Sequence, residues 1–161
     1  MIKAIVACDP TGGIGLDGAM PWPHNKVDLW NFQALTIGHA VVMGSKTWSS
    51  LPKSLVNRTQ YVLTTQETLE FKKDNEPKLI TGDLENILPK LSLLHDTVWI
   101  MGGADIYKQA WESIQEWNIT IHPKVYASDV YIDLEGIYDE FTLVDSYIMS
   151  ELEFQTLRKN I

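Results

Sequence analysis

Residues 40–48 read Ala-Val-Val-Met-Gly-Ser-Lys-Thr-Trp, an apolar run that stops at a glycine and continues into a short segment predicted to be helical. A short apolar run of this kind, bounded by a turn residue, is typical of a strand buried on both faces, as in parallel sheets covered by helices. The order strand, glycine, helix recurs at residues 78–94 and 97–110. The pattern predicts an α/β fold.

The remaining segments add strands and a helix to this α/β pattern, and towards the C-terminus only strands are expected. Residues 2–8 and 61–63 are predicted strands, and residues 26–37 a helix. Beyond about residue 117, strands are expected at 117–122, 130–132, 141–147 and 153–157 without intervening helices. The sheet should therefore begin parallel and finish antiparallel. Residues 67–76, rich in charge, are expected to form a surface helix or loop.

Composition limits the class of protein. With 161 residues, of which 45% are apolar, one domain spanning residues 1–161 is expected. The net charge of −8 argues against nucleic acid as a partner. The apolar start reads as a strand rather than a signal peptide, and no run is long enough to suggest a membrane partner. Cys8, the single cysteine, is expected in the core, in keeping with a cytoplasmic location.

The segment 15–32 combines a loop with an unusual carboxylate. Glycines and prolines interrupt its first half and leave Met20 and Trp22 on a loop that can hinge. In the helical half, Asp28, Phe32 and Leu35 share one face at spacing i, i+4, i+7. A carboxylate in such a stripe is costly to desolvate, which favours a functional role in binding a planar, amidine-like ligand edge.

Two strand-to-helix junctions carry glycine where phosphates are often bound, Gly44-Ser45-Lys46-Thr47 and Gly102-Gly103-Ala104-Asp105. Neither matches a dinucleotide or Walker fingerprint, and each alone is equally consistent with a simple turn. As a pair on neighbouring parallel strands they could bind a dinucleotide.

Other polar residues leave two interpretations open. Arg58 could bind a ligand carboxylate or lie solvated at the surface, and Thr120 could hydrogen-bond a carboxylate or be an ordinary strand residue. Four scattered histidines, His24, His39, His95 and His122, lack metal-site spacing, so surface or core roles are favoured and no metal is expected.

Taken together, these residues make the chain resemble the dihydrofolate reductase family, of the chromosomal, bacterial-like type, over nearly its full length. The motifs that match, in the family's order and at nearly its spacing, are Ile14-Gly15, Ala19-Met20-Pro21-Trp22, Asp28-Leu29, Phe32, Val42-Met43-Gly44, Thr47-Trp48, Leu55, Arg58, Gly102-Gly103, Ile106-Tyr107 and Thr120.

The resemblance implies an α/β fold in three layers: a mixed eight-stranded sheet, mostly parallel with antiparallel C-terminal strands, and helices on both faces. It implies a monomer that transfers hydride from NADPH to C6 of 7,8-dihydrofolate while N5 gains a proton. The product, 5,6,7,8-tetrahydrofolate, supports one-carbon metabolism, and antifolate-type molecules are expected ligands.

The same resemblance implies residue roles. Asp28 would hold the pterin N3 and 2-amino edge with hydrogen-bond support from Thr120, while Met20 and Trp22 lie on the loop that closes over the nicotinamide; these four are the expected catalytic residues. With Asp28 and Thr120, the expected substrate-binding residues are Ile5, Val6, Ala7, Phe32, Leu51, Lys53, Leu55, Arg58 (for the glutamate α-carboxylate), Met101 and Tyr107. The expected cofactor-binding residues are Ala7, Ile14, Gly15, Ala19, Gly44, Ser45, Lys46, Thr47, Leu63, Thr64, Thr65, Thr81, Met101, Gly102, Gly103, Ala104, Asp105, Ile106 and Tyr107.

Three positions depart from the family pattern. Ser45 and Asp105 stand where cations usually meet the adenosine 2′-phosphate, although Lys46 and the hydroxyls of Thr64 and Thr65 remain. NADPH is still predicted, with weaker discrimination against NADH. The third departure is one extra residue in the stretch 23–27, which could alter loop closure without disturbing Asp28.

Two alternatives differ in testable ways. A reductase of the same fold acting on a ribosylated pyrimidine in riboflavin synthesis would need neither Asp28 nor Arg58. A folate- or nucleotide-binding structural protein would bind ligand without turnover.

Overall fold

The computed structural model describes residues 1–65 and 76–161. Nearly all of the segment 67–76, predicted as a surface helix or loop, lies outside the described residues. The chain divides into two compact units, one of residues 1–2 and 35–113 and one of residues 3–34 and 114–161. Each is described by itself.

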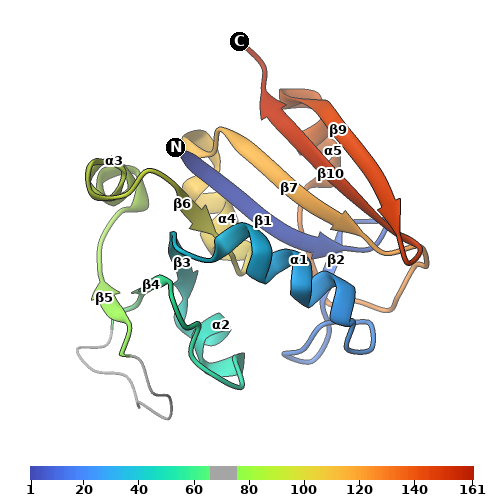
Figure 1. Cartoon of the computed structure of the whole chain (residues 1–161), viewed down its shortest axis with the longest axis horizontal. Coiled ribbons are helices and arrows are strands. Elements are labelled where there is room, and N and C mark those ends of the chain that lie inside the picture. Colours follow the sequence, from blue (N-terminus) through green and yellow to red (C-terminus); the bar gives the residue numbers. More distant parts are fainter. Residues whose placement is uncertain (66–75) are drawn as a thin grey trace. The chain divides into compact units, whose positions relative to one another are not determined.

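The unit of residues 35–113 is built on four parallel strands in the order β5-β4-β3-β6. Val42 of β3 pairs with Tyr61 of β4 and with Ile100 of β6, and the β3 residues 40–43 are fully buried. Continuous burial of β3 and β6 explains why these two strands could be predicted from apolar runs. Its elements are β3 (Ala40–Gly44), α2 (Ser45–Ser50), β4 (Thr59–Leu63), β5 (Lys78–Ile80), α3 (Leu84–Leu94), β6 (Val98–Ile100), α4 (Ala104–Ala110) and the 3₁₀ turn η1 (Trp111–Ser113) (Figure 1).

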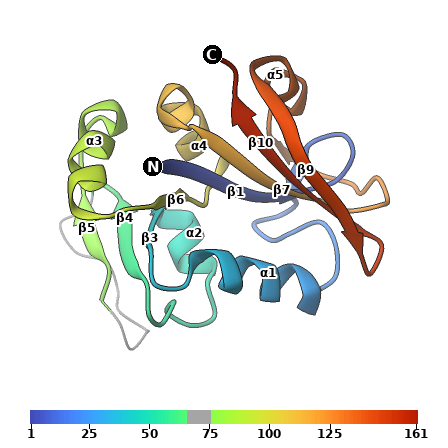
Figure 2. The ribbon, with the colours of Figure 1, turned by 45° about the horizontal axis from the view of Figure 1, so that its top comes forward.

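In the other unit, β7 pairs in parallel with β1 and antiparallel with β10, and β10 pairs antiparallel with β9. Figure 2 shows β9 and β10 running side by side, with α5 next to β9. Its elements are β1 (Ile2–Cys8), β2 (Gly13–Gly15), α1 (Lys26–Thr36, whose last two residues belong to the first unit), β7 (Glu116–Ile121), β8 (Val130–Tyr131), α5 (Leu134–Glu140), β9 (Phe141–Met149) and β10 (Leu152–Lys159).

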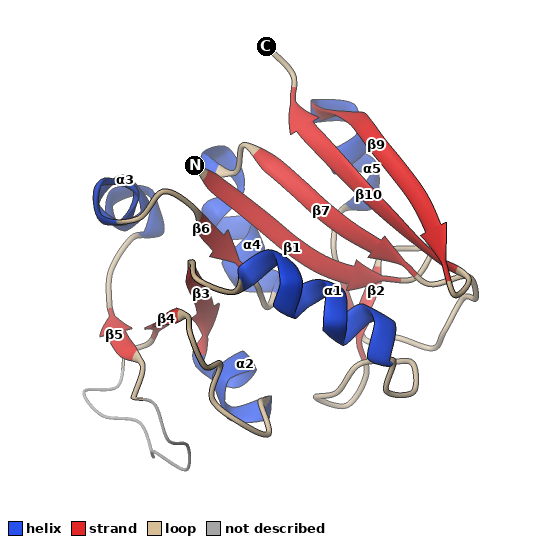
Figure 3. Cartoon of the chain, viewed as in Figure 1, coloured by secondary structure: helices blue, strands red, loops and turns tan. Residues whose placement is uncertain are grey.

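The prediction of a C-terminal region without helices is wrong. Helix α5 separates β8 from β9 (Figure 3), and the side chain of Asp133 caps it by accepting a hydrogen bond from the Gly136 N–H at 3.0 Å. Only Ile137 of this helix is buried, so it lacks the apolar stripe by which helices are found in sequence. The predicted strand at 130–132 exists as β8, but it pairs with the unpredicted β2 in a separate two-stranded sheet.

The remaining expectations for fold class are confirmed. Eight strands form a mixed sheet in which every pair involving β10 is antiparallel and the other described pairs are parallel. In the described part of the chain, no helix is both long and apolar enough to cross a membrane.

Candidate active site

Helix α1 begins where a side chain caps it, and this places Asp28 in its first turn. The Oδ1 atom of Asn25 accepts hydrogen bonds from the backbone N–H groups of Val27 at 3.0 Å and Asp28 at 3.1 Å. A carboxylate in the first turn is stabilised by the positive end of the helix dipole. The extra residue in the stretch 23–27 is thus accommodated in the loop and the cap, and Asp28 keeps a regular helical position.

The face of α1 that carries Asp28 is the inner one. Asp28, Phe32 and Leu35 are half-buried, whereas Leu29 and Trp30 are exposed, as the i, i+4, i+7 spacing predicts. The Asp28 side chain retains 16% of its accessible surface. A carboxylate that is partly shielded from water and still accessible can exchange its remaining hydration for a ligand's N–H groups.

An aromatic and charged cluster surrounds this carboxylate. Trp22 is buried, and its indole stacks on the imidazole of His122 with ring centroids 3.9 Å apart and an interplanar angle of 18°. Tyr126 meets the same indole edge-on at 6.0 Å. His122 Nε2 lies 3.7 Å from Asp28 Oδ2. We call Trp22, Asp28, His122 and Tyr126 the carboxylate cluster.

His122 is the member of this cluster that the sequence prediction missed. The spacing among the four histidines argues only about metal ligation. The spacing that matters for His122 is the one that separates it from Thr120. Thr120, predicted to support Asp28, is buried on β7, and a residue two positions later in an extended chain points to the same side. The pair Thr120 and His122 could therefore have been expected together. The hydrogen bond from Thr120 to Asp28 stays a prediction.

Asp9 fixes the start of the loop that leads to Trp22. Its buried carboxylate accepts hydrogen bonds from Thr11 N at 2.9 Å, Thr11 Oγ1 at 2.7 Å, Gly13 N at 3.0 Å and Tyr126 N at 2.9 Å. Burial alone would raise the pKa of Asp9, but these hydrogen bonds outweigh it and hold the pKa below its ordinary value. Burial, and then the charge of Asp9, raises the pKa of the Cys8 thiol to about 12, so Cys8 is a neutral buried side chain.

In the other unit, the two glycine junctions lie beside each other. Gly44 ends β3 and Gly103 precedes α4, and the backbone N–H of Gly44 donates to the carbonyl of Gly102 at 2.9 Å. No side chain caps α2 or α4. A Cβ atom on Gly44 would lie 3.2 Å from Ile106, and one on Gly103 would lie 3.8 Å from the Thr47 hydroxyl. The predicted pairing of the junctions is confirmed.

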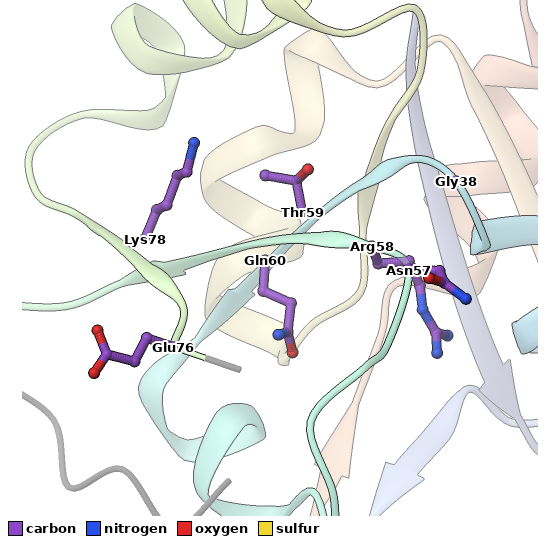
Figure 4. A pocket seen from close by; sticks show the side chains of 7 residues that line it. All are labelled: Gly38, Asn57, Arg58, Thr59, Gln60, Glu76 and Lys78. Atoms are coloured by element: carbon purple, nitrogen blue, oxygen red, sulfur yellow. The ribbon is translucent and has the colours of Figure 1, made fainter. Parts of the chain in front are cut away.

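Arg58 is anchored by neutral oxygen atoms. Its Nε donates to the Val56 carbonyl at 2.9 Å and one terminal nitrogen to Thr36 Oγ1 at 3.2 Å. The side chain is half-buried, and burial lowers the pKa of Arg58. Figure 4 shows it at an open hollow lined by Gly38, Asn57, Arg58, Thr59, Gln60, Glu76 and Lys78. A guanidinium can bind an anionic group in a forked hydrogen bond.

The other predicted residues occupy four kinds of position. One group belongs to the same unit as the carboxylate cluster: Ile5, Val6 and Ala7 on β1, Ile14 and Gly15 on β2, and the exposed loop residues Ala19 and Met20. Those on the connection from α2 to β4 are Leu51, Lys53 and Leu55, the last positioned by its N–H donating to Gln60 Oε1 at 3.1 Å. At strand ends are Leu63, Thr64, Thr65, Thr81 and Met101. At helix starts are Ser45, Lys46 and Thr47 on α2 and Ala104, Asp105, Ile106 and Tyr107 on α4, with Lys46 and Asp105 exposed.

The profile of the family described as dihydrofolate reductase matches residues 1–156. Dihydrofolate reductase type 8 of Escherichia coli is 33% identical over 143 residues, 87% of this chain and 85% of that protein. Dihydrofolate reductase of Gallus gallus is 35% identical over 163 residues, 91% of this chain and 84% of that protein.

A solved structure has the same fold. The dihydrofolate reductase from Enterococcus faecalis, complexed with NADP(H) and RAB-propyl, matches 100% of this chain and 97% of its own with a TM-score of 0.81 at 24% identity. The chain belongs to the dihydrofolate reductase family, and it is an oxidoreductase of folate metabolism.

Proposed function

We propose that this chain reduces 7,8-dihydrofolate to 5,6,7,8-tetrahydrofolate with NADPH, using Asp28 as the residue that holds the pterin. The observation that carries this assignment is the half-buried Asp28 carboxylate in the first turn of α1, in a chain of this family. It lies 3.7 Å from His122, the imidazole on which the buried Trp22 indole stacks. The proposal includes action as a single domain and as a monomer in the cytoplasm, with antifolate-type molecules as ligands and without nucleic acid or membrane as partners.

Asp28 suits the pterin because its two oxygens match two donors. The N3–H and the 2-amino group of a pterin form one planar edge, which a carboxylate can accept in a paired hydrogen bond. Partial burial removes competing water, and the helix dipole stabilises the anion that makes these bonds. The same negative charge favours proton uptake at N5, an assistance worth roughly 10²- to 10⁴-fold in rate.

The glycine junctions suit a dinucleotide. Gly44 and Gly103 allow a ligand to approach the backbone, and the starts of α2 and α4 carry no side-chain cap that would compete for their N–H groups. Residues 44–47 and 102–106 would hold the cofactor, with Thr64 and Thr65 contributing hydroxyls. When bound, NADPH supplies the hydride. Ser45 and the exposed Asp105 lower the positive charge available to its 2′-phosphate.

Arg58 and its neighbours suit the opposite end of the substrate. A half-buried guanidinium that lines an open hollow can bind the glutamate α-carboxylate in a forked hydrogen bond. Leu51 and Leu55, both half-buried, would contact the benzoyl ring. Because these contacts are remote from the reacting atoms, they contribute binding energy rather than chemistry.

The deciding experiment mixes the purified chain with dihydrofolate and NADPH and follows loss of reduced-nicotinamide absorbance. Asp28→Asn is the matched variant, since it preserves shape and removes charge. Turnover in the parent chain, with a severe loss in the variant that still binds NADPH, supports the assignment. Binding without absorbance loss would identify a non-catalytic binding protein, and turnover of a ribosylated pyrimidine alone would identify the riboflavin-type reductase. Equal activity of Asp28→Asn would show that another group serves the pterin.

A further inference from the structure

His122 is a buried imidazole to which the proposed reaction assigns no role. Only 3% of the residue is exposed, and its backbone N–H donates to the Cys8 carbonyl at 2.8 Å, which fixes it just beyond β7. Its ring is stacked at 3.9 Å on the Trp22 indole. The side chain is therefore held from two sides, by the backbone of β1 and by the loop.

The Nε2 atom of this imidazole faces the Asp28 carboxylate. It lies 3.7 Å from Oδ2, which is within ion-pair range and slightly longer than a hydrogen bond. Among the described residues this buried nitrogen has no hydrogen-bond partner. A buried polar atom is normally paired, and the nearby anionic oxygen is the acceptor towards which an Nε2–H would be drawn.

Titratable groups on the other adjoining elements do not compete for this nitrogen. Cys8 is neutral, since its pKa is about 12, and the Asp9 oxygens accept hydrogen bonds from Thr11, Gly13 and Tyr126. The Tyr126 ring packs on the indole rather than on the imidazole nitrogen. The remaining charged or ionisable groups on the adjacent loops and on the start of α1 belong to exposed residues: Asp17, His24, Lys26, Lys124 and Asp129.

We propose that His122 is a positioning residue that couples the Trp22 loop to the Asp28 carboxylate. Its ring holds the indole, and an Nε2–H directed at Oδ2 supports the negative charge and the orientation of the carboxylate. This inference rests on the role of Asp28 proposed above. It assigns His122 no direct contact with substrate.

Removal of either partner has an expected sign. A carboxylate that loses a neighbouring cation binds a proton more readily, so a pH transition of turnover that is governed by Asp28 should move to higher pH when the imidazole is removed. Conversely, an imidazole that loses a neighbouring anion gives up its proton more readily.

Two substitutions separate the two contacts of His122. His122→Phe keeps an aromatic ring to stack on Trp22 and removes the nitrogen that faces Asp28. His122→Gln keeps an N–H donor and removes the ring. His24→Phe is the matched control. His24 is an exposed histidine on the loop that carries Trp22, and it has no recorded contact in the described part of the chain.

The kinetic test is the pH dependence of kcat and kcat/KM. His122→Phe should move the midpoint to higher pH, His122→Gln should restore part of that shift, and His24→Phe should leave the midpoint in place. An unchanged midpoint in His122→Phe, or an equal shift in His24→Phe, would overturn the coupling.

A second test does not depend on turnover and uses the chain with its native His122. The imidazole ring protons are titrated by NMR in the parent chain and in Asp28→Asn, with the His122 signals assigned by their absence from a His122 variant or by isotope labelling. Loss of the Asp28 charge should move the His122 midpoint to lower pH and leave the His24 midpoint in place. The same midpoint in both chains would refute the inference. A shifted midpoint in a chain that does not reduce dihydrofolate would retain it and reject the proposed function instead.

Discussion

Asp9 offers the most direct test of how the loop before Trp22 is held. Its carboxylate accepts four hydrogen bonds, of which the one from Tyr126 N goes to Oδ2 and the other three go to Oδ1. In Asp9→Asn the amide oxygen can still accept three bonds, but the amide nitrogen then faces the Tyr126 N–H, donor against donor. Losing one hydrogen bond to a charged group costs about 1.5–3 kcal/mol. We expect the free energy of unfolding to fall by that amount near neutral pH.

The pH dependence of this difference has a defined sign. Because the folded-state pKa of Asp9 lies below its ordinary value, the carboxylate contributes stability above that ordinary value and loses it as the pH falls through the folded-state pKa. Asp9→Asn has no such group. Urea denaturation of both chains, at neutral pH and at the lowest pH where both remain folded, should show the gap in unfolding free energy narrowing with acidity.

Asp145→Asn is the matched control for this measurement, since Asp145 is an exposed carboxylate on β9 with no recorded side-chain contact. It should change the free energy of unfolding by less than about 0.5 kcal/mol. Equal urea midpoints for Asp9→Asn and the parent chain would contradict the reasoning. So would a gap that persists undiminished in acid, since it could not come from the ionised carboxylate.

Three further outcomes are expected. Arg58→Ala should raise KM for dihydrofolate more than it lowers kcat in steady-state assays, and a dominant kcat effect would contradict its assignment to the remote carboxylate. A double substitution of Ser45 and Asp105 by Arg should increase the preference for NADPH over NADH about tenfold or more in kcat/KM; a strong preference already present in the parent chain would refute the predicted weakness. Gly12→Ala should cost about 1–3 kcal/mol in urea unfolding, because Gly12 has φ of +86° and a Cβ atom there would lie 2.7 Å from the Ile132 carbonyl oxygen; unchanged stability would show that the backbone relaxes.

The sequence predicts best the elements that have a local pattern of their own. The bounds expected for β1 agree with the structure because β1 is an apolar run, and helix α1, which was predicted from its helical spacing, differs by one residue at its end. Strand β2, by contrast, is only Gly13–Gly15, and its hydrogen bonds depend on β8 more than a hundred residues away. Such an element has no local pattern to recognise.

The residues of the candidate site also differ in whether a local sequence pattern reveals them. Asp28 could be predicted because a charged residue interrupts a helix stripe, and the glycine junctions because they end buried strands. His122 could not be found from histidine spacing, since its partners Trp22 and Asp28 precede it by about a hundred residues. Tertiary contact alone brings the imidazole to the carboxylate. For Arg58, the sequence left two interpretations open, and its half-buried position in the lining of an open hollow favours the binding role.

Parts of the loop before α1 have a fixed conformation, although its glycines and prolines suggest a loop that can hinge throughout. Leu16 and Ala19 exchange two backbone hydrogen bonds, of 2.8 and 3.0 Å, around Asp17 and Gly18, which both have positive φ. That is a preformed tight turn of the kind that closes hairpins, and glycine serves the turn rather than a hinge. Trp22, at 5% exposure, is fixed by its stack on His122, whereas Met20 is 54% exposed.

The loop therefore consists of a formed turn and an anchored indole, joined by Met20 and Pro21. The family resemblance assigns Met20 to a loop that closes over the nicotinamide, and such a movement would not need to order a random segment, because the turn can move as a unit about the short connection to Trp22. The entropy cost of that closure would be correspondingly small, since few backbone dihedrals would remain to be fixed. Trp22 and Asp28 could then stay in place while the loop moves, which would preserve the geometry of the proposed pterin site through each turnover.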